Sequence, residues 1–228
     1  MDASIQTRLL VVTIDGPAGA GKSTVARALA SRLGYSYLDT GALYRAVAWK
    51  AHATGTDCTD PVTLKECLNH MDLHVTLENE TTRTIVDSQD VTPYLRAPGV
   101  TRLASTVAAV PEVRNWLLPI QQQFGKSGGI VAEGRDMGTR VFPNADVKFF
   151  LNADLDTRTA RRYRESHQAG HAGNEQETRN QIQDRDARDQ SRNFSPLVPA
   201  ADAIVLDSSS MTVEEVITTM LESISTRL

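Results

Sequence analysis

A glycine-rich segment near the start of the chain, Gly16-Pro17-Ala18-Gly19-Ala20-Gly21-Lys22-Ser23, has the residue types and spacing of a phosphate-binding loop. Its glycines allow consecutive backbone N–H groups to face one point, and a helix that starts there adds partial positive charge. Lys22 is expected to reach the β- and γ-phosphates of a nucleoside triphosphate, and the Ser23 hydroxyl to bind Mg²⁺. The predicted contacts with the triphosphate are Gly16, Pro17, Ala18, Gly19, Ala20, Gly21, Lys22, Ser23 and Thr24.

The flanking segments have the character that such a loop requires. The apolar run 9–14 predicts a buried strand, and residues 24–30 predict a helix. A second strand over 34–39 and a helix from Thr40 to about Thr54 continue the alternation. This order indicates an α/β fold with a parallel sheet, in which ligands bind at the carboxyl ends of the strands.

Polar and charged residues follow two predicted strands. Asp39, Thr40, Tyr44 and Arg45 come at and after the end of the second strand. A buried strand over 128–132 leads into Glu133, Arg135 and Asp136 through glycines. Because strand ends meet at one edge of a parallel sheet, we expect these side chains near the phosphate loop. Thr40 has a second interpretation, since it is also suited to cap the helix that it begins.

Residues 60–94 change character, with one helix and then three short strands of alternating apolar and polar residues. They predict a small antiparallel insert, which must pack on the main body or move as a lobe because it cannot bury a large core alone. The remaining predicted elements are a helical stretch from Pro98 to Val110, a helix from Glu112 to Phe124, strands over 147–151 and 203–207, and a helix over 213–225.

The segment from about Asp156 to Arg192 is rich in arginine, but acids balance it, whereas a nucleic-acid surface would carry one sign. Two helices joined at Gly170-His171-Ala172-Gly173 would form a hinged cover. The alternative is a solvated helical hairpin held by i,i+4 ion pairs.

Composition excludes several classes of protein. The 228 residues carry a net charge of -4, which offers no basic footprint for a nucleic-acid polymer. Cys58 and Cys67 make neither a disulfide framework nor a zinc site. The polar residues 1–6 do not fit a secretory signal, and no apolar run is long enough for a membrane span. We therefore expect a cytoplasmic protein without a membrane partner.

A phosphate loop leaves open what receives the phosphoryl group. No guanine-reading Asn-Lys-x-Asp string occurs, and the chain is short for a motor or transport ATPase. Arginines on a mobile cover, Lys22 and Mg²⁺ on Ser23 would neutralise charge on a transferred phosphoryl group. The residues thus favour a small-molecule kinase.

Five segments together resemble the bacterial cytidylate kinase family. They are the phosphate loop from Ile14 to Ser23, Leu38 to Arg45, Glu133 to Thr139, Arg185 to Asp189, and Pro196 to Asp202. The insert at 60–94 is also similar to the enlarged monophosphate-binding lobe of the bacterial enzymes.

The resemblance implies an ATP:(d)CMP phosphotransferase with the P-loop nucleoside monophosphate kinase fold. One domain would consist of a core with a parallel five-stranded sheet flanked by helices (8–59, 95–155 and 193–228), a monophosphate-binding insert (about 60–94) and a helical lid (about 156–192). Such folds commonly work as monomers. The implied substrates are CMP and dCMP, with ATP and Mg²⁺.

Site residues follow from the same match. The resemblance assigns the acceptor phosphate to Arg45, Arg135 and Arg192, the cytosine to Ser105, Arg114 and Asp136, the sugar to Arg185 and Asp189, and places near the acceptor Thr40 and Tyr44. A carboxylate opposite the cytosine N4 amino group would accept its hydrogen bond and repel the O4 of uracil. Lys22, Arg135, Arg192 and the lid residues Arg158 and Arg162 are the expected catalytic groups.

Some points stay open at this stage. Arg140 stands where an apolar residue is expected. Glu133, Asp136 and Asp39 could each hold a water of Mg²⁺. The other readings are a P-loop kinase of the adenylate or shikimate type and a non-catalytic ATP sensor.

Overall fold

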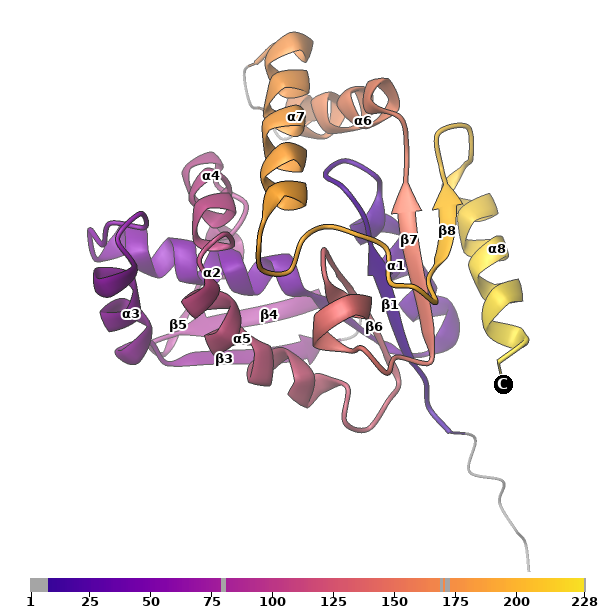
Figure 1. Ribbon diagram of the computed structural model, residues 1–228, viewed down its shortest axis with the longest axis horizontal. Coiled ribbons are helices and arrows are strands. Elements are labelled where there is room, and N and C mark those ends of the chain that lie inside the picture. Colours follow the sequence, from indigo (N-terminus) through magenta and orange to yellow (C-terminus); the bar gives the residue numbers. More distant parts are fainter. Residues whose placement is uncertain (1–7, 79–80, 169, 171–172, 228) are drawn as a thin grey trace, which may run out of the picture.

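Short apolar segments form the central sheet. The computed structural model describes residues 8–78, 81–168, 170 and 173–227, and five strands in them are parallel, in the spatial order β2-β6-β1-β7-β8 (Figure 1). Their bounds are β1 (Val11–Asp15), β2 (Ser36–Asp39), β6 (Ile130–Gly134), β7 (Val147–Asn152) and β8 (Ile204–Asp207). This confirms the predicted α/β class and the five-stranded sheet.

Alternate residues of the strands face two different cores, as the pleat of a sheet requires. Tyr37 packs with α1 (Lys22–Leu33) and α8 (Val213–Ser225), whereas the next residue, Leu38, packs with α2 (Thr40–Ala53) and α5 (Pro111–Phe124). Helices therefore cover both faces of the sheet.

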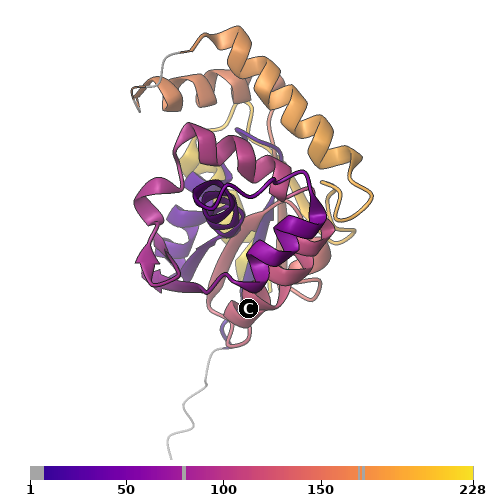
Figure 2. The same ribbon diagram turned by 90° about the vertical axis from the view of Figure 1, so that its left-hand side faces the viewer.

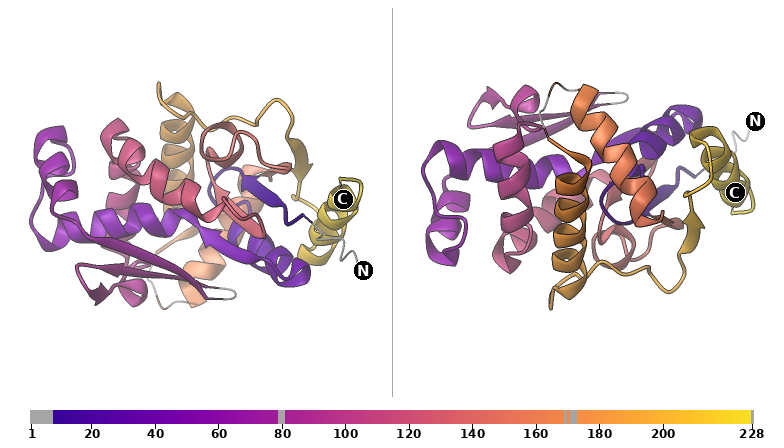
Figure 3. Two further views of the ribbon diagram at one scale, coloured as in Figure 1. Left: turned by 90° about the horizontal axis from the view of Figure 1, so that it is seen from below. Right: turned by 90° about the horizontal axis from the view of Figure 1, so that it is seen from above.

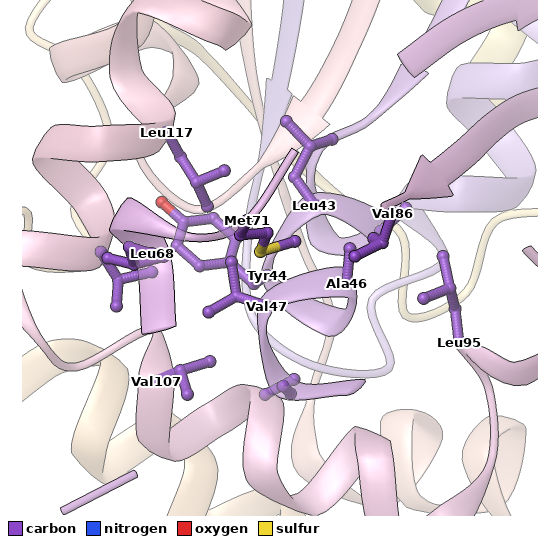
Figure 4. Packing of buried hydrophobic residues seen from close by; sticks show 14 of the residues in the cluster. Leu43, Tyr44, Ala46, Val47, Leu68, Met71, Val86, Leu95, Val107 and Leu117 are labelled. Carbon is purple, nitrogen blue, oxygen red and sulfur yellow. The ribbon is translucent and has the colours of Figure 1, made fainter. Parts of the chain in front are cut away.

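The second core extends into residues 60–94. They contain α3 (Pro61–Asn69), a sheet of β3 (Leu73–Glu78), β4 (Thr81–Val86) and β5 (Gln89–Asp90), and the 3₁₀ turn η1 (Thr92–Tyr94). Figure 4 shows side chains of α3, of β4 and of the adjoining loops, among them Leu68, Met71, Val86 and Leu95, around α2. The Thr82 hydroxyl also accepts a hydrogen bond from Asp39 N at 3.1 Å. The small sheet thus packs on the main body.

The strand predicted over 128–132 lies two residues later, at Ile130–Gly134. Gly128 and Gly129 both have φ 67, in the left-handed region, and form a turn instead. A Cβ at Gly128 would overlap the carbonyl oxygen of Leu9, which lies just before β1. In consequence Glu133 is part of the strand, and Asp136 comes just beyond its end.

Two helices follow the insert, and an unexpected turn follows β6. Helix α4 spans Pro98–Val107, and α5 begins at Pro111, one residue before the predicted start, because the fixed φ of proline suits the first helical position. A π-helical turn, η2 (Met137–Val141), follows Asp136. This turn was not predicted from the sequence.

The arginine-rich segment forms a pair of packed helices, α6 (Leu155–Gln168) and α7 (Glu175–Ser191). Figures 1 and 2 show the pair arching over the carboxyl end of the sheet, and Figure 3 shows it from above, across the phosphate loop. Residues 79–80 of the predicted insert and 171–172 of the predicted joint lie outside the described residues. In the part of the chain that the structure describes, no helix is long and apolar enough to cross a membrane.

Candidate active site

The phosphate loop connects β1 to α1 at the carboxyl edge of the sheet, under α6 (Figure 3). Gly16 has φ 150, and a Cβ there would overlap the carbonyl oxygen of Leu151 in β7. Gly21, with φ 90, precedes the first residue of α1. Only glycine allows the backbone to run this close to the neighbouring strand and still present the N-terminus of α1.

Lys22 is the basic group of this loop. Its side chain is buried, and Nζ donates to the carbonyl oxygen of Pro17 at 2.7 Å. Burial first and the positive charge of Arg135 second lower the pKa of Lys22 to about 7, against the attraction of Glu133. A bound polyphosphate would supply the negative charge that this buried amine lacks.

Residues of α6 and α7 hold the phosphate loop, among them Arg158 and Asp186. The Arg158 guanidinium donates to Ala18 O at 3.1 Å and to the Asp186 carboxylate, which itself accepts from Ala18 N at 3.1 Å. Arg158 in α6 and Asp186 in α7 are buried. Arg162, one turn further along α6, is half-exposed and pairs with Glu165 at 2.8 Å. Both predicted lid arginines therefore lie on the helix above the loop, but only Arg158 contacts it.

Asp189, near the end of α7, is surrounded by arginines. Its carboxylate accepts from Arg135 Nε at 2.9 Å and from Arg192, with Arg185 Nε 4.0 Å away. Burial alone would raise the pKa of Asp189, but the charges of Arg135 and Arg192 outweigh it and hold the pKa below its usual range. One carboxylate thus faces three guanidinium groups.

Burial and the excess of positive charge both lower the pKa of Arg185. Partial burial first, and then the charges of Arg135, Arg45 and Arg162, lower its pKa to about 9, with Asp189 opposing them. Residues from α2, the end of β6, α6 and α7 therefore converge at this point. Asp189, Asp39 beside Arg45 and Glu165 beside Arg162 offset these cations only in part. A cluster with an excess of cations suits a multiply charged anion.

A buried ion pair lies beside the arginine cluster. Arg114 Nη2 in α5 is 2.6 Å from Asp136 Oδ2, and both side chains are almost fully buried, at 2% and 3% exposed. The guanidinium also donates to Ala108 O at 2.9 Å and lies 5.2 Å from the centre of the Tyr44 ring. Among the described residues the buried Ser105 hydroxyl of α4 has no hydrogen-bond partner. The hydroxyl therefore retains an unused donor and acceptor.

Asp15 holds the backbone of this region, a role that the sequence analysis missed. Its two carboxylate oxygens accept from Met137 N at 2.9 Å and Gly138 N at 2.8 Å, at the start of η2. Burial raises the pKa of Asp15 to about 6, although these hydrogen bonds oppose the shift. The available signal was an acid at the end of a mostly apolar strand, directly before the phosphate loop.

Glu133 is positioned from two sides. The Tyr37 hydroxyl donates to Glu133 Oε1 at 2.6 Å, and the Thr40 hydroxyl donates to the Glu133 carbonyl oxygen at 2.6 Å. The alternative role of Thr40 as a helix cap is wrong, because Asp39 is the N-cap of α2 and accepts from Ala42 N. Asp39 comes one residue earlier, with extended backbone, as an N-cap requires.

The three acids considered for Mg²⁺ differ in their surroundings. Asp39 caps α2 and pairs with Arg45 at 2.6 Å, and Asp136 pairs with Arg114. Glu133 retains one carboxylate oxygen beyond the Tyr37 bond and acts electrostatically on Lys22. Together with the Ser23 hydroxyl on the first turn of α1, it offers the oxygen ligands that Mg²⁺ prefers. No group of three or more His, Cys, Asp or Glu side chains suited to a metal occurs in the described part of the chain.

Comparison with known proteins shows similarity to one protein family over nearly the whole chain. The model of the cytidylate kinase family matches residues 12–226. Cytidylate kinase 1 of Haemophilus influenzae is 43% identical over 208 residues, which is 91% of this chain and 90% of that protein. Cytidylate kinase of Desulfitobacterium hafniense is 44% identical over 213 residues, or 93% of this chain and 91% of that protein.

A solved structure supports the fold alone. An uncharacterized protein from Eubacterium ventriosum superposes with a TM-score of 0.52 at 14% sequence identity, covering 95% of this chain and 98% of that one.

Proposed function

This chain belongs to the cytidylate kinase family, and we propose that it transfers the γ-phosphoryl group of ATP to CMP and dCMP. The bond between the γ-phosphorus and the β–γ bridging oxygen breaks, and a bond forms to a phosphate oxygen of the acceptor, giving ADP with CDP or dCDP. The observation that carries the proposal is the convergence of Arg45, Arg135, Arg185 and Arg192 beside Lys22. Two phosphate groups brought together there would have their mutual repulsion offset.

The chain's own groups divide the work by position. The ATP phosphates are held by the Lys22 amine and by the loop from Gly16 to Thr24. The loop acts through its backbone N–H groups, except at Pro17, which has none, and at Ala18, which donates to Asp186. Arg158 and Arg162 approach from the lid, and closure of that lid excludes water from the transfer. Arg135 and Arg192 hold the acceptor phosphate in line with the donor.

Recognition of the acceptor base is assigned to the buried Arg114–Asp136 ion pair and to Ser105. Asp136 accepts from the cytosine N4 amino group, with Ser105 and Arg114 on the other polar atoms of the base. Uracil would bring an oxygen lone pair against the same carboxylate, which disfavours it. Arg185 and Asp189 take the sugar, while Thr40 and Tyr44 complete the wall of the acceptor site.

Mg²⁺ is proposed to bind at Ser23, with a water held by Glu133. An ion held by these residues would neutralise charge on the transferred phosphoryl group. Tyr37 fixes one oxygen of Glu133 at 2.6 Å and thereby directs the other.

The remaining properties are proposals as well. We divide the chain into a core, an insert at about 60–94 and a lid at about 156–192, supported by the separate three-stranded sheet and the α6–α7 pair. We expect a monomer in the cytoplasm, where ATP and free nucleotides are available and where the two free cysteines would stay reduced.

The test is ADP formation from ATP and Mg²⁺ by the full chain, with CMP, dCMP, UMP, AMP and GMP each offered as acceptor. Turnover with CMP and dCMP and little with the other three is the expected result. Turnover with AMP would instead assign the chain to the adenylate type. ATP binding without turnover on any monophosphate would indicate a sensor.

A further inference from the structure

Arg140 lies in η2, four residues after Asp136, at a position where the sequence analysis expected an apolar residue. Its Nη2 donates to Asn115 Oδ1 at 2.9 Å, and its guanidinium carbon lies 3.8 Å from the centre of the Phe194 ring. The contact with the ring is well within the range of a cation–π interaction. One side chain thus joins η2 to α5 and to the segment that follows α7.

Each partner of Arg140 is a close neighbour of a proposed site residue. Asn115 follows Arg114 directly in α5, and Phe194 is the second residue after Arg192. The backbone N–H of Arg140 donates to the carbonyl oxygen of Asp136 at 2.9 Å. The contacts of Arg140 therefore link the segments that carry Arg114, Asp136 and Arg192.

The segment after α7 depends on such anchors. It has no regular secondary structure, and Ser195 adopts φ 55, which is unusual for a residue other than glycine. Leu197 N donates to the carbonyl oxygen of Asp189 at 2.8 Å, which ties the middle of the segment back to α7. Arg140 supplies the anchor at the near end, beside Arg192. Irregular backbone opens locally unless packing or hydrogen bonds hold it.

We propose that Arg140 is a positioning residue for the acceptor phosphate: it clamps Phe194 against η2 and α5, and so sets Arg192 relative to the Arg114–Asp136 pair. The inference rests on the proposed function, since it concerns the acceptor site of that reaction. Arginine suits this role because its planar group stacks on a ring while its edge still donates in the plane. A lysine ammonium can keep the positive charge over the ring, but it lacks the planar set of N–H donors of the guanidinium.

The test measures KM for CMP, KM for ATP and the midpoint of thermal unfolding in the full-length protein. The variants are Arg140→Met, Arg140→Lys, Phe194→Leu and the double variant Arg140→Met/Phe194→Leu. The matched control is Arg32→Met, because Arg32 makes a surface pair with Glu214 between α1 and α8, away from the site.

Arg140→Met is expected to raise KM for CMP by about 5- to 30-fold, the range for losing a stacked cation together with a charged hydrogen bond. KM for ATP should stay at the wild-type value, since the phosphate loop is untouched. Arg140→Lys should recover part of the affinity for CMP. Adding Arg140→Met to Phe194→Leu should have a smaller effect than Arg140→Met alone, because both changes remove the same contact.

The inference is wrong if Arg140→Met lowers the unfolding midpoint while KM for CMP stays at the wild-type value, which is the result of a purely structural role. Equal rises in both KM values, additive effects in the double variant, or an equal rise in Arg32→Met would also overturn it. A wild-type protein without CMP-dependent turnover would refute the proposed function instead. The two failures are therefore distinguishable.

Discussion

Replacing Asp136 by asparagine preserves the shape of the side chain and removes its charge. In the structure Asp136 Oδ2 lies 2.6 Å from Arg114 Nη2, and neither side chain reaches solvent to any extent. The variant leaves the Arg114 cation buried, with Ala108 O and the Tyr44 ring as its remaining contacts. We therefore expect the change to affect stability as well as recognition.

The magnitude follows from the burial of the pair. Removing one partner of a buried ion pair costs about 3–5 kcal/mol, because the other charge stays desolvated. The amide oxygen of asparagine and the carbonyl of Ala108 compensate in part, so we expect about 3 kcal/mol, at the lower end of that range. For a chain of this size, about 3 kcal/mol lowers the unfolding midpoint by about 6 to 12 °C.

A second variant separates stability from recognition. Arg114→Met/Asp136→Leu removes both charges and fills the space with apolar groups, which often restores or improves stability. This double variant should unfold near the wild-type temperature and still fail to use CMP. Asp136→Asn should raise KM for CMP at least about tenfold, since it loses an ionised acceptor for N4, and should leave KM for ATP unchanged.

The measurements are thermal unfolding of the apo protein and steady-state ADP formation, with CMP and ATP varied separately. Asp136→Asn with a wild-type midpoint would refute the energetic argument for the pair. Unchanged CMP kinetics in either variant would remove Asp136 from the base pocket. Loss of affinity for both substrates would point to a general collapse of the site.

The other predictions concern the donor side. Because burial lowers the pKa of Lys22 to about 7, the amine is largely neutral at pH 8, and ATP binding should take up protons there and weaken as pH rises. Calorimetry in two buffers of different ionisation enthalpy measures this proton uptake. Lys22→Ala should abolish the uptake while CMP binding persists. ATP binding to the wild-type protein without proton uptake would show that the Lys22 amine is not the group that takes up the proton. Gly16→Ala should abolish ATP binding or folding, because a Cβ at this position overlaps β7. Gly34 also has positive φ but has open space around it, so Gly34→Ala should cost only about 1 kcal/mol of unfolding free energy. Equal effects of the two substitutions would show that crowding against β7 is unimportant. Tyr37→Phe removes the 2.6 Å bond to Glu133 and should raise the Mg²⁺ concentration for half-maximal turnover without changing KM for CMP; an unchanged Mg²⁺ requirement would exclude the role given to Glu133.

Local sequence determined the elements and their order. The closing helix lies over 213–225 as predicted, and the pattern of strands and helices was sufficient for the parallel sheet, because hydrophobic period and chain connection are local properties. The phosphate loop is equally local, since glycine spacing, strand and helix are consecutive in the chain. The start of β6 differs from the prediction because Gly128 and Gly129 have positive φ and form a turn before the strand.

Contacts between distant segments were decided by the tertiary structure alone. Asp15 is hydrogen-bonded to Met137 and Gly138, more than a hundred residues away, and no sequence pattern encodes that capping. The same holds for the Tyr37–Glu133 bond. A residue type and its spacing indicate which chemistry is available, whereas the partner that orients each group depends on how strands and helices from the whole chain pack together.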